Sequence, residues 1–442
     1  MATGLNHKTG GHGETRALAA STVSFTVCFA VWTIFSIIGV QIKQNLGLNE
    51  TQFGLLAGTP ILTGSLIRIF LGIWTDQFGG RVINVVVMLL AAVATWLLTY
   101  AETYPQFLLA ALGVGIAGGS FAVGVAYVSK WYPKERQGMA LGIFGAGNVG
   151  AAVTKFLAPF VMVAMGWQAV AQIWAVALVV MAAIFWFTTD DDPDLIERRR
   201  NHKHAKGTLL QLEPLKNLQV WRFSLYYFFV FGAFVALALW LPQYLVGVYG
   251  LDIKQAGMIA AFYSIPGSLF RVLGGWLSDR YGARRVMYWT FIMSVICTFL
   301  LSYPPTHYVV RGIDRDIEFT LEMGLPVFMF LIFVLGFFMS LGKAAVFKHI
   351  PVYYAGHVGA VGGLVGMIGG LGGFILPIAF GALNDLTHIW TSCFMLLFAL
   401  VATALTWMHF AIRILDQKQH PELARPAYLP ELSEKEHRHR TA

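Results

Sequence analysis

Two arginines in this sequence stand inside long apolar runs, and the residue types that follow them repeat. Gly72, Asp76, Gly79 and Arg81 follow Arg68, and Gly275, Asp279, Gly282 and Arg284 follow Arg271 at the same spacings. Placing an arginine in hydrocarbon costs at least about 2.5–3.5 kcal/mol, so such a residue normally faces a cavity and acts there. A single arginine of this kind would be expected simply to pair with an acid. Because two occur at equivalent places in two repeats, we predict a binding role for both.

The acidic residues leave both arginines without a fixed counter-ion. All 23 Asp and Glu fall in tails, loops or the ends of apolar runs. A guanidinium stays protonated in proteins, so the missing negative charge must belong to a mobile ion. Its planar fork donates paired hydrogen bonds to planar oxyanions. Two forks on opposite walls of a cavity therefore predict a small, flat, trigonal anion as the ligand.

The elements that must position these arginines are membrane-spanning helices. Of the 442 residues, 57% are hydrophobic and only 12% are charged, which is too little polar surface for a water-soluble protein. A helix needs about 20 residues to cross the bilayer, whereas a β-barrel would show short alternating segments. We therefore predict an all-α membrane protein with twelve transmembrane helices. They lie near residues 18–42, 51–74, 82–101, 106–129, 139–163, 167–188, 223–244, 255–277, 286–303, 325–347, 358–381 and 390–413.

The chain divides into two six-helix halves. We predict a tail at 1–17, a first half at 18–188, a linker at 189–221, a second half at 222–413 and a second tail at 414–442. Six spans per half make both halves enter from the same side, as parallel repeats. Of the 31 Lys and Arg, only Lys43, Lys254, Arg311 and Arg315 fall on the predicted outer loops. This positive-inside bias predicts that both tails and the linker are cytoplasmic.

The same distribution accounts for the net charge of +8 without a nucleic-acid partner. Cys28, Cys297 and Cys393 fall in separate spans and have no metal-binding or disulfide spacing. No nucleophile–base pair, phosphate-binding loop or metal-ligand set is present. We therefore expect no enzyme, no catalytic residue, no cofactor and no metal.

The polar N-terminal stretch shows no removable signal peptide. The mixed charges of the outer connection 302–324 indicate a solvated loop, with a lid as the alternative.

Spans five and eleven are rich in glycine. Span five contains Gly142, Gly145, Gly147, Asn148 and Gly150, and span eleven contains Gly359, Gly362, Gly363, Gly366, Gly369, Gly370, Gly372 and Gly373. Small residues three or four apart let helices pack closely, which explains most of these glycines. They also leave the helices deformable and the cavity between them narrow. Asn148 adds one uncharged amide near the middle of the membrane.

The repeated turn after spans two and eight resembles the conserved loop of the major facilitator superfamily, and two copies in a twelve-span chain extend the match over the whole sequence. The resemblance implies that the Asp and Arg of each turn pair with neighbouring helix ends and latch one conformation. Asp76, Arg81, Asp279 and Arg284 are therefore expected to be gating residues, not ligands of the anion.

Gly145-Ala146-Gly147-Asn148-Val149-Gly150, the glycines of span eleven and the two arginines together resemble the nitrate/nitrite porter family, from about Thr22 to about Ile412. The resemblance implies that Arg68 and Arg271 grip the anion. It also implies that the glycines and Asn148 line the site and that aromatic rings enclose the flat ion. The implied binding residues are Arg68, Arg271, Asn148, Gly145, Gly147, Gly366, Gly369, Phe121, Tyr227 and Phe231.

Lys155 is a third cation within a span, and its equivalent in span eleven is Gly373. We favour an interpretation in which its side chain snorkels to the outer interface. The alternative is a proton-coupling group, because a buried amine can lose its proton near neutral pH.

The expected function is secondary transport of nitrate, and of nitrite, by alternating access across the bacterial inner membrane, by a monomer. Proton symport is favoured because the outer loop and Lys155 resemble the proton-coupled importers of the family. Nitrate/nitrite antiport is an alternative, because no carboxylate lies within the spans to accept a proton. Transport of another small anion and a non-transporting membrane sensor are the other two alternatives. The linker and the C-terminal tail are too short to form signalling domains, which disfavours the sensor.

Overall fold

The computed structural model describes residues 12–132, 134–193, 195–196, 217–353 and 358–419. The described part of the first half is helical throughout its spans. Its helices are α1 (His12–Trp32), α2 (Ile38–Leu46), α3 (Glu50–Leu66), α4 (Arg68–Phe78), α5 (Gly80–Leu97), α6 (Tyr104–Val114), α7 (Ser120–Trp131), α8 (Lys134–Gly145), α9 (Gly150–Met165) and α10 (Trp167–Thr188). Short 3₁₀ turns join several of them: η1 (Ile34–Ser36), η2 (Leu98–Tyr100), η3 (Gly115–Gly119) and η4 (Ala146–Val149).

The second half repeats this helical pattern and adds a pair of strands. Its helices are α12 (Leu218–Tyr227), α13 (Phe234–Tyr249), α14 (Ile253–Leu269), α15 (Arg271–Tyr281), α16 (Ala283–Leu301), α17 (Leu325–Tyr353), α18 (Val358–Thr387) and α19 (Ser392–Gln419). A π-helical turn, η6 (Phe228–Ala233), joins α12 to α13. The strands β1 (Thr306–Arg311) and β2 (Asp316–Leu321) lie between α16 and α17.

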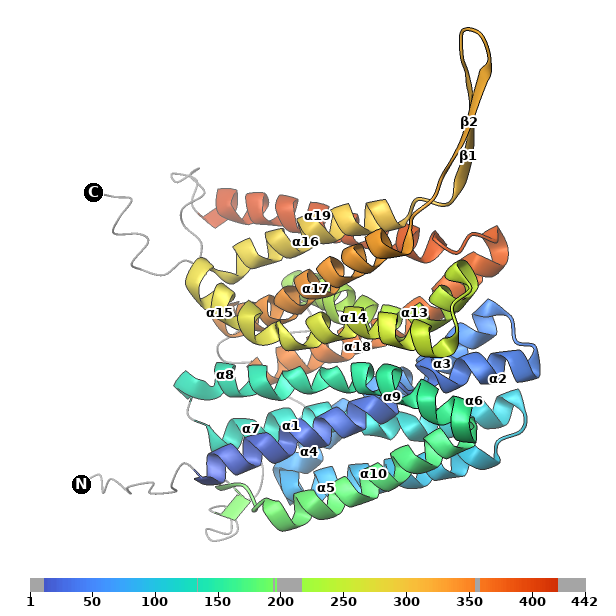
Figure 1. The fold of residues 1–442 in the computed structure, drawn as a ribbon. Helices are drawn as coiled ribbons and strands as arrows, with labels where there is room; N and C mark the ends of the chain where they lie inside the picture. The colour runs from blue at the N-terminus through green and yellow to red at the C-terminus, as the bar shows by residue number, and fades with distance from the viewer. Residues whose placement is uncertain (1–11, 133, 194, 197–216, 354–357, 420–442) are drawn as a thin grey trace.

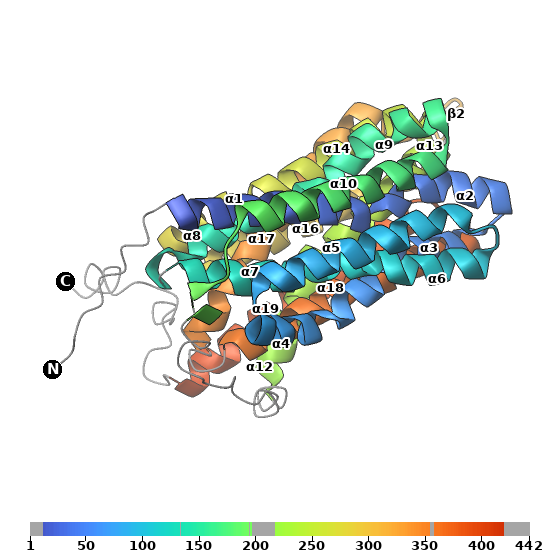
Figure 2. The same cartoon turned by 90° about the horizontal axis from the view of Figure 1, so that it is seen from below.

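The two halves lie side by side with their helices running along one common direction (Figures 1 and 2). In Figure 1, α1 to α10 form the lower group and α13 to α17 with α19 the upper group, while α18 lies along the boundary. Across that boundary α18 packs against α3, and α14 packs against α9. α1 begins and α19 ends at one end of the bundle, called here the terminus end. The strands leave from the opposite end, called here the hairpin end.

Within the described residues, eleven helical segments are long and apolar enough to cross a membrane, and they coincide with eleven of the twelve predicted spans. The remaining prediction, 51–74, corresponds to α3 and α4, which are separated by Ile67 and are 17 and 11 residues long. Hydrogen bonds from Ile67 N to Thr63 O and from Leu71 N to Ile67 O keep the two helices in line. The first span also differs from the prediction, because α1 stops at Trp32 and α2 continues it.

The repeated turns require glycine for a steric reason. Gly79, between α4 and α5, has φ of 93°, and Gly282, between α15 and α16, has φ of 84°. A side chain is strained in this region of backbone space, whereas glycine adopts it freely. At Gly79 an added Cβ would also lie 2.5 Å from Leu195 Cδ2. The duplicated motif therefore encodes the same tight reversal in both halves.

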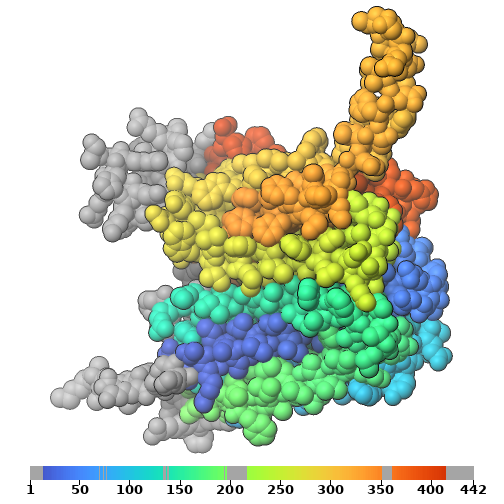
Figure 3. All heavy atoms as spheres, viewed as in Figure 1, coloured from blue at the N-terminus to red at the C-terminus, as the bar shows by residue number. Residues whose placement is uncertain are grey.

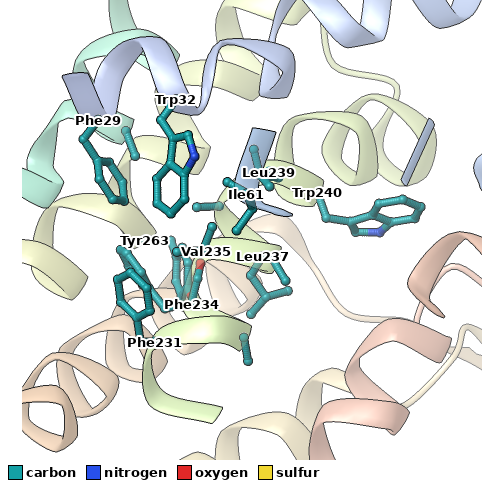
Figure 4. Packing of buried hydrophobic residues seen from close by; sticks show 14 of the residues in the cluster. Phe29, Trp32, Ile61, Phe231, Phe234, Val235, Leu237, Leu239, Trp240 and Tyr263 are labelled. Carbon is teal, nitrogen blue, oxygen red and sulfur yellow. The ribbon is translucent and has the colours of Figure 1, made fainter. Parts of the chain in front are cut away.

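Aromatic side chains fill the boundary between the halves. Phe29 and Trp32 of α1 point toward Phe231, Phe234 and Tyr263 of the second half (Figure 4). All five are buried, and the three cysteines are also buried, as unpaired thiols in separate helices. The interior at this boundary thus combines aromatic rings with aliphatic side chains such as Ile61 and Val235.

The outer connection between α16 and α17 is not the irregular loop that its charges suggested. β1 and β2 form an antiparallel hairpin in which Thr306 pairs with Leu321 and Arg311 with Asp316. Cross-strand pairs such as Tyr308 with Phe319, whose rings stack, stabilise this pairing. The hairpin projects away from the helices and stands clear of the bundle (Figures 1 and 3). It therefore does not cover the hairpin end as a lid.

Candidate anion-binding site

Both arginines occupy the same position in their half. Each is the first residue of the helix that begins after a one-residue break in a membrane span. Arg68 follows Ile67 and begins α4, while Arg271 follows Phe270 and begins α15. Both side chains are buried, with 6% and 7% of their surface exposed. Arg68 Nη1 donates a hydrogen bond of 3.2 Å to the carbonyl of Gly366 on α18, which belongs to the other half. The site therefore lies on the boundary between the halves.

Aromatic rings surround Arg68. Its Cζ lies 5.5 Å from the ring centroid of Trp32, 5.2 Å from that of Phe121 and 5.6 Å from that of Phe231. These rings come from α1, α7 and η6, so they belong to both halves. Cation–π attraction is strongest where water is excluded, as it is here. It replaces part of the hydration that the guanidinium loses.

Arg271 also lies beside one of the rings that surround Arg68. Its Cζ lies 5.8 Å from the centroid of Phe121 and 5.8 Å from that of Phe347 on α17. Tyr227 packs edge to face against Phe347 and stacks on Phe231, with centroids 5.0 Å and 5.1 Å apart. The two guanidiniums are close enough to repel each other. Phe121, predicted as a site aromatic, is thus the ring that both cations contact.

Several buried polar atoms at this place have no hydrogen-bond partner among the described residues. They are Ser65 Oγ, Arg68 Nε, Tyr227 Oη and Arg271 Nη1. Elsewhere, in η4, Asn148 Oδ1 and Nδ2 also have no partner among the described residues. No ion pair joins either arginine to an acid within the described residues. Buried polar groups are normally satisfied, and those that are not need an explanation. Donors around two uncompensated cations have the chemistry required to bind an anion.

The predicted residues of span five occupy different places. A Cβ on Gly145 would lie 3.0 Å from Arg271 Nη1, so this glycine leaves room for the guanidinium. The fully buried Asn148 lies in η4, between α1 and α14. At Gly147 the nearest atoms to an added Cβ are Phe25 Cδ1 at 2.6 Å and Thr22 O at 3.1 Å. Gly147 therefore packs against α1, and its expected role beside the anion stays a prediction.

The glycines of α18 differ in how closely other atoms approach them. Gly369 packs so closely that a Cβ would lie 2.2 Å from Tyr227 Cδ1, and at Gly370 it would lie 2.4 Å from Ser65 Oγ and 3.4 Å from Arg68 Nη1. At Gly363 and Gly366 an added Cβ meets nothing within 4 Å. Gly366 contributes its carbonyl oxygen, and Gly369 makes room for Tyr227. One side of α18 thus has open space at Gly363 and Gly366, on the terminus-end side of Gly369.

Three residues near the arginines were not among the predicted site residues: Trp32, Phe347 and Lys343. The fully buried Lys343 on α17 donates to Gly267 O at 2.7 Å, and its Nζ lies 3.1 Å from the ring centroid of Phe234. The region therefore contains three buried basic side chains, those of Arg68, Arg271 and Lys343. A lysine near a helix end has no sequence signal that distinguishes this position from an interfacial one.

Lys155 does not snorkel to an interface. Its side chain is fully buried, and its Nζ donates to Ala151 O at 3.2 Å and to Ser264 Oγ at 2.9 Å. Ser264 lies on α14, so this bond joins the two halves. A Cβ on Gly257 would lie 2.3 Å from Lys155 O, which shows how closely α9 and α14 pack here. The favoured interpretation is wrong, and the alternative of a titratable buried amine remains a prediction.

The predicted gating residues make contacts within their own halves. Arg81 Nη2 donates to Trp186 O at 2.5 Å at the end of α10, and Asp279 Oδ1 lies 2.5 Å from Lys348 Nζ on α17. Arg284 is buried, and the side chain of Asp76 lies outside the described residues. Pairing of Arg81 with a helix end is the arrangement that the resemblance implied. A latching role for these four residues stays a prediction.

At the hairpin end, one acid joins the two halves. Asp385, near the end of α18, accepts hydrogen bonds from Glu50 N at 3.1 Å and from Thr51 N at 2.8 Å. These amides begin α3, where Asn49 caps only the next one, that of Gln52. A carboxylate at a helix N-terminus satisfies free N–H groups and interacts favourably with the helix dipole. Asp385 thus caps a helix of the other half.

We expect Asp385→Ala to open the hairpin end. Losing an N-terminal cap costs about 1–2 kcal/mol, which shifts a two-state equilibrium by roughly 5- to 30-fold. Spin labels at the exposed Glu102 and Tyr303, one in each half, would report the change by pulsed EPR as more pairs at long distance. Asp314→Ala in the hairpin turn is the matched control. Unchanged distances in Asp385→Ala would contradict a latching role.

The sequence and the fold both match known families. The major facilitator superfamily model matches residues 20–307 and 249–436. Two solved structures of a bacterial homologue of the human lysosomal transporter Spinster superpose with TM-scores of 0.67 and 0.68, at 16% and 17% identity. Each alignment covers 91% of this chain and 97% of the other. The all-α fold of a multi-pass membrane protein is thereby confirmed.

Relatives at higher sequence identity show which family of the superfamily the chain belongs to. The chain is 42% identical to "Probable nitrate/nitrite antiporter NarK1" of Thermus thermophilus, over 92% of this chain and 94% of the relative. It is 30% identical to "Nitrite extrusion protein" of Bacillus subtilis (strain 168), over 92% and 96%. It is also 30% identical to "Probable nitrate transporter NarT" of Staphylococcus haemolyticus (strain JCSC1435), over 84% and 90%. With its duplicated arginines and glycine-rich helices, the chain belongs to the nitrate/nitrite porter family of the major facilitator superfamily.

Proposed function

We propose that this protein is a secondary transporter of nitrate, and of nitrite, that works by alternating access. The observation that carries the proposal is the pair Arg68 and Arg271, buried on the boundary between the halves, with Phe121 beside both and no acid paired to either within the described residues. A flat monovalent oxyanion between two guanidinium forks fits this arrangement in charge, shape and hydrogen bonding. The names of the relatives support the same substrate class.

The anion itself takes part in the conformational cycle. Without it the two guanidiniums repel each other across the boundary. With it, one negative charge between them offsets this repulsion and lets the halves close. Asp385 and Lys155 hold the hairpin end together, while α18 has room beside Gly363 toward the terminus end. In the opposite conformation the hairpin end would be open and the terminus end closed. Exchange between the two conformations would expose the arginines to each side of the membrane in turn.

For the coupling we propose nitrate/proton symport, with Lys155 as the group that binds the proton. Lys155 is buried, bonds across the boundary and has no ion-pair partner among the described residues. A protonation change there would alter the Ser264 contact and so the equilibrium between conformations. Nitrate/nitrite antiport is the second candidate. It is favoured by the repulsion that an empty site would experience, and by the name of the 42% identical relative.

We further propose that the protein lies in the bacterial cytoplasmic membrane with the terminus end inside the cell. The concentration of Lys and Arg in the tails and linker supports this orientation. Both arginines come from one chain, so a monomer holds a complete site. No nucleic acid, metal or cofactor enters this scheme.

Reconstitution into proteoliposomes would test the proposal. Nitrate should bind, and small carboxylates should compete poorly, because a carboxylate has two oxygens, enough for one fork, whereas nitrate presents three oxygens in one plane to two forks. Uptake of labelled nitrate into anion-free liposomes under an inward proton gradient would support symport. Uptake only when nitrite or nitrate is trapped inside would support antiport. Binding without any uptake would contradict transport and favour a sensor.

A further inference from the structure

The hairpin β1–β2 has two chemically different faces. Because directly paired residues of an antiparallel ladder share a face, the pairs Tyr308–Phe319, Val310–Ile317 and Thr306–Leu321 lie on one side. This side is called here the apolar face. The pairs His307–Thr320, Val309–Glu318 and Arg311–Asp316 lie on the other side, called here the polar face.

Both faces of the hairpin are largely exposed, and they differ in the contacts that their side chains make. On the polar face, His307 Nδ1 lies 3.2 Å from Thr320 Oγ1, and its Nε2 lies 3.8 Å from Glu318 Oε2. On the apolar face, Ile317, Phe319 and Leu321 are 53%, 47% and 50% exposed. Tyr308 and Phe319 stack with centroids 5.2 Å apart. A solvated loop has no need for such a segregated apolar surface.

The position of the hairpin relative to the helix ends bears on what covers this surface. It leaves the bundle beside the ends of α16 and α17, where Phe299 and Phe330 are exposed as lipid-facing residues of a membrane helix are. From there it extends sideways, across the helix axes and away from the bundle, at the level where the helices end (Figures 1 and 3). In a membrane this places it over the lipid beside the protein, not over the transport path.

We propose that the apolar face of the hairpin lies on the membrane interface and contacts lipid. The stacked Tyr308 and Phe319 sit at the depth where aromatic side chains are enriched in membrane proteins, and Ile317 and Leu321 extend the contact into the outermost acyl region. Glu318 and His307 face water on the opposite side. The hairpin is thus a lateral extension of the lipid-facing surface of the second half.

Site-directed spin labelling tests this directly. Single cysteines replace Phe319 on the apolar face and Glu318 on the polar face, in a chain whose three buried native cysteines are changed to serine. The labelled protein is reconstituted into vesicles of phosphatidylethanolamine and phosphatidylglycerol. Oxygen collides with labels in lipid, and a water-soluble nickel chelate collides with labels in water. We expect oxygen to dominate at Phe319→Cys and the chelate at Glu318→Cys.

A second pair of labels, Leu321→Cys and Thr320→Cys, repeats the comparison without removing Phe319 from its stack. Equal access of the chelate to both faces would overturn the proposal, because the hairpin would then stand in water. Shielding of the apolar face from both reagents would also overturn it and would indicate a protein partner, including a second copy of this chain. Spin–spin broadening between labelled copies would identify that second copy.

Discussion

Replacing either site arginine with lysine is expected to reduce nitrate uptake almost to the background of protein-free liposomes. Arg68→Lys and Arg271→Lys keep the positive charge but remove the planar fork, which an ammonium cannot reproduce. A hydrogen bond to a charged group contributes about 1.5–3 kcal/mol, so each substitution should weaken nitrate binding by roughly 10- to 100-fold. Calorimetry and initial uptake rates measure the two effects separately.

Arg280→Lys is the matched control for this prediction. Arg280 lies on the same helix as Arg271 but is exposed, with its guanidinium 5.3 Å from the ring centroid of Trp276. Its conversion to lysine should leave uptake unchanged. Wild-type uptake by Arg68→Lys or Arg271→Lys, at equal abundance in the membrane, would rule out the two-fork site.

Lys155→Gln is expected to abolish nitrate uptake driven by a proton gradient and to preserve exchange of external for internal nitrate. Glutamine keeps much of the length and can still bond Ser264, but it does not bind a proton in the physiological range. Exchange needs no net proton movement, so it should continue. Measuring both activities in the same liposomes distinguishes a coupling role from a structural one.

Lys254→Gln provides the control for Lys155. Lys254 stands at the start of α14, with its Nζ 5.5 Å from the ring centroid of Phe160, and its side chain is partly exposed. Both activities should survive that change. If gradient-driven uptake persists in Lys155→Gln, the proton route lies elsewhere. If both activities fall together, Lys155 acts by holding α9 against α14.

The sequence was sufficient to find the arginines because their surroundings are duplicated. The spacing from Arg68 to Arg81 recurs after Arg271, and the structure shows why, since each arginine follows an interrupted helix and each turn needs a glycine with positive φ. Trp32 and Phe347 could not be found in this way. They come from distant helices in a chain with 34 Phe, and nothing local separates a ring beside a cation from a ring in the core.

Three further features that the sequence did not predict have physical explanations. Counting residues along a helix gives the depth of Lys155 but not the direction of its side chain, so burial against Ser264 was not predictable. The charges of residues 302–324 indicate a solvated loop, whereas the alternation of Ile317, Phe319 and Leu321 with polar residues is the pattern of a strand. Asp385 was not recognised either, because its partner Thr51 is 334 residues away along the chain.

The fixed position of the arginines has an electrical consequence. Arg68 donates a hydrogen bond to the Gly366 carbonyl, and both arginines belong to helices that stay in the membrane. Of these charges, therefore, only that of the anion crosses the membrane field. Moving one negative charge into a cell whose interior is negative costs about 2.3 kcal/mol for each 100 mV. A proton moving with the anion, or an anion leaving in exchange, cancels that charge. With either one-to-one coupling, nitrate flux should carry no current and should be insensitive to voltage.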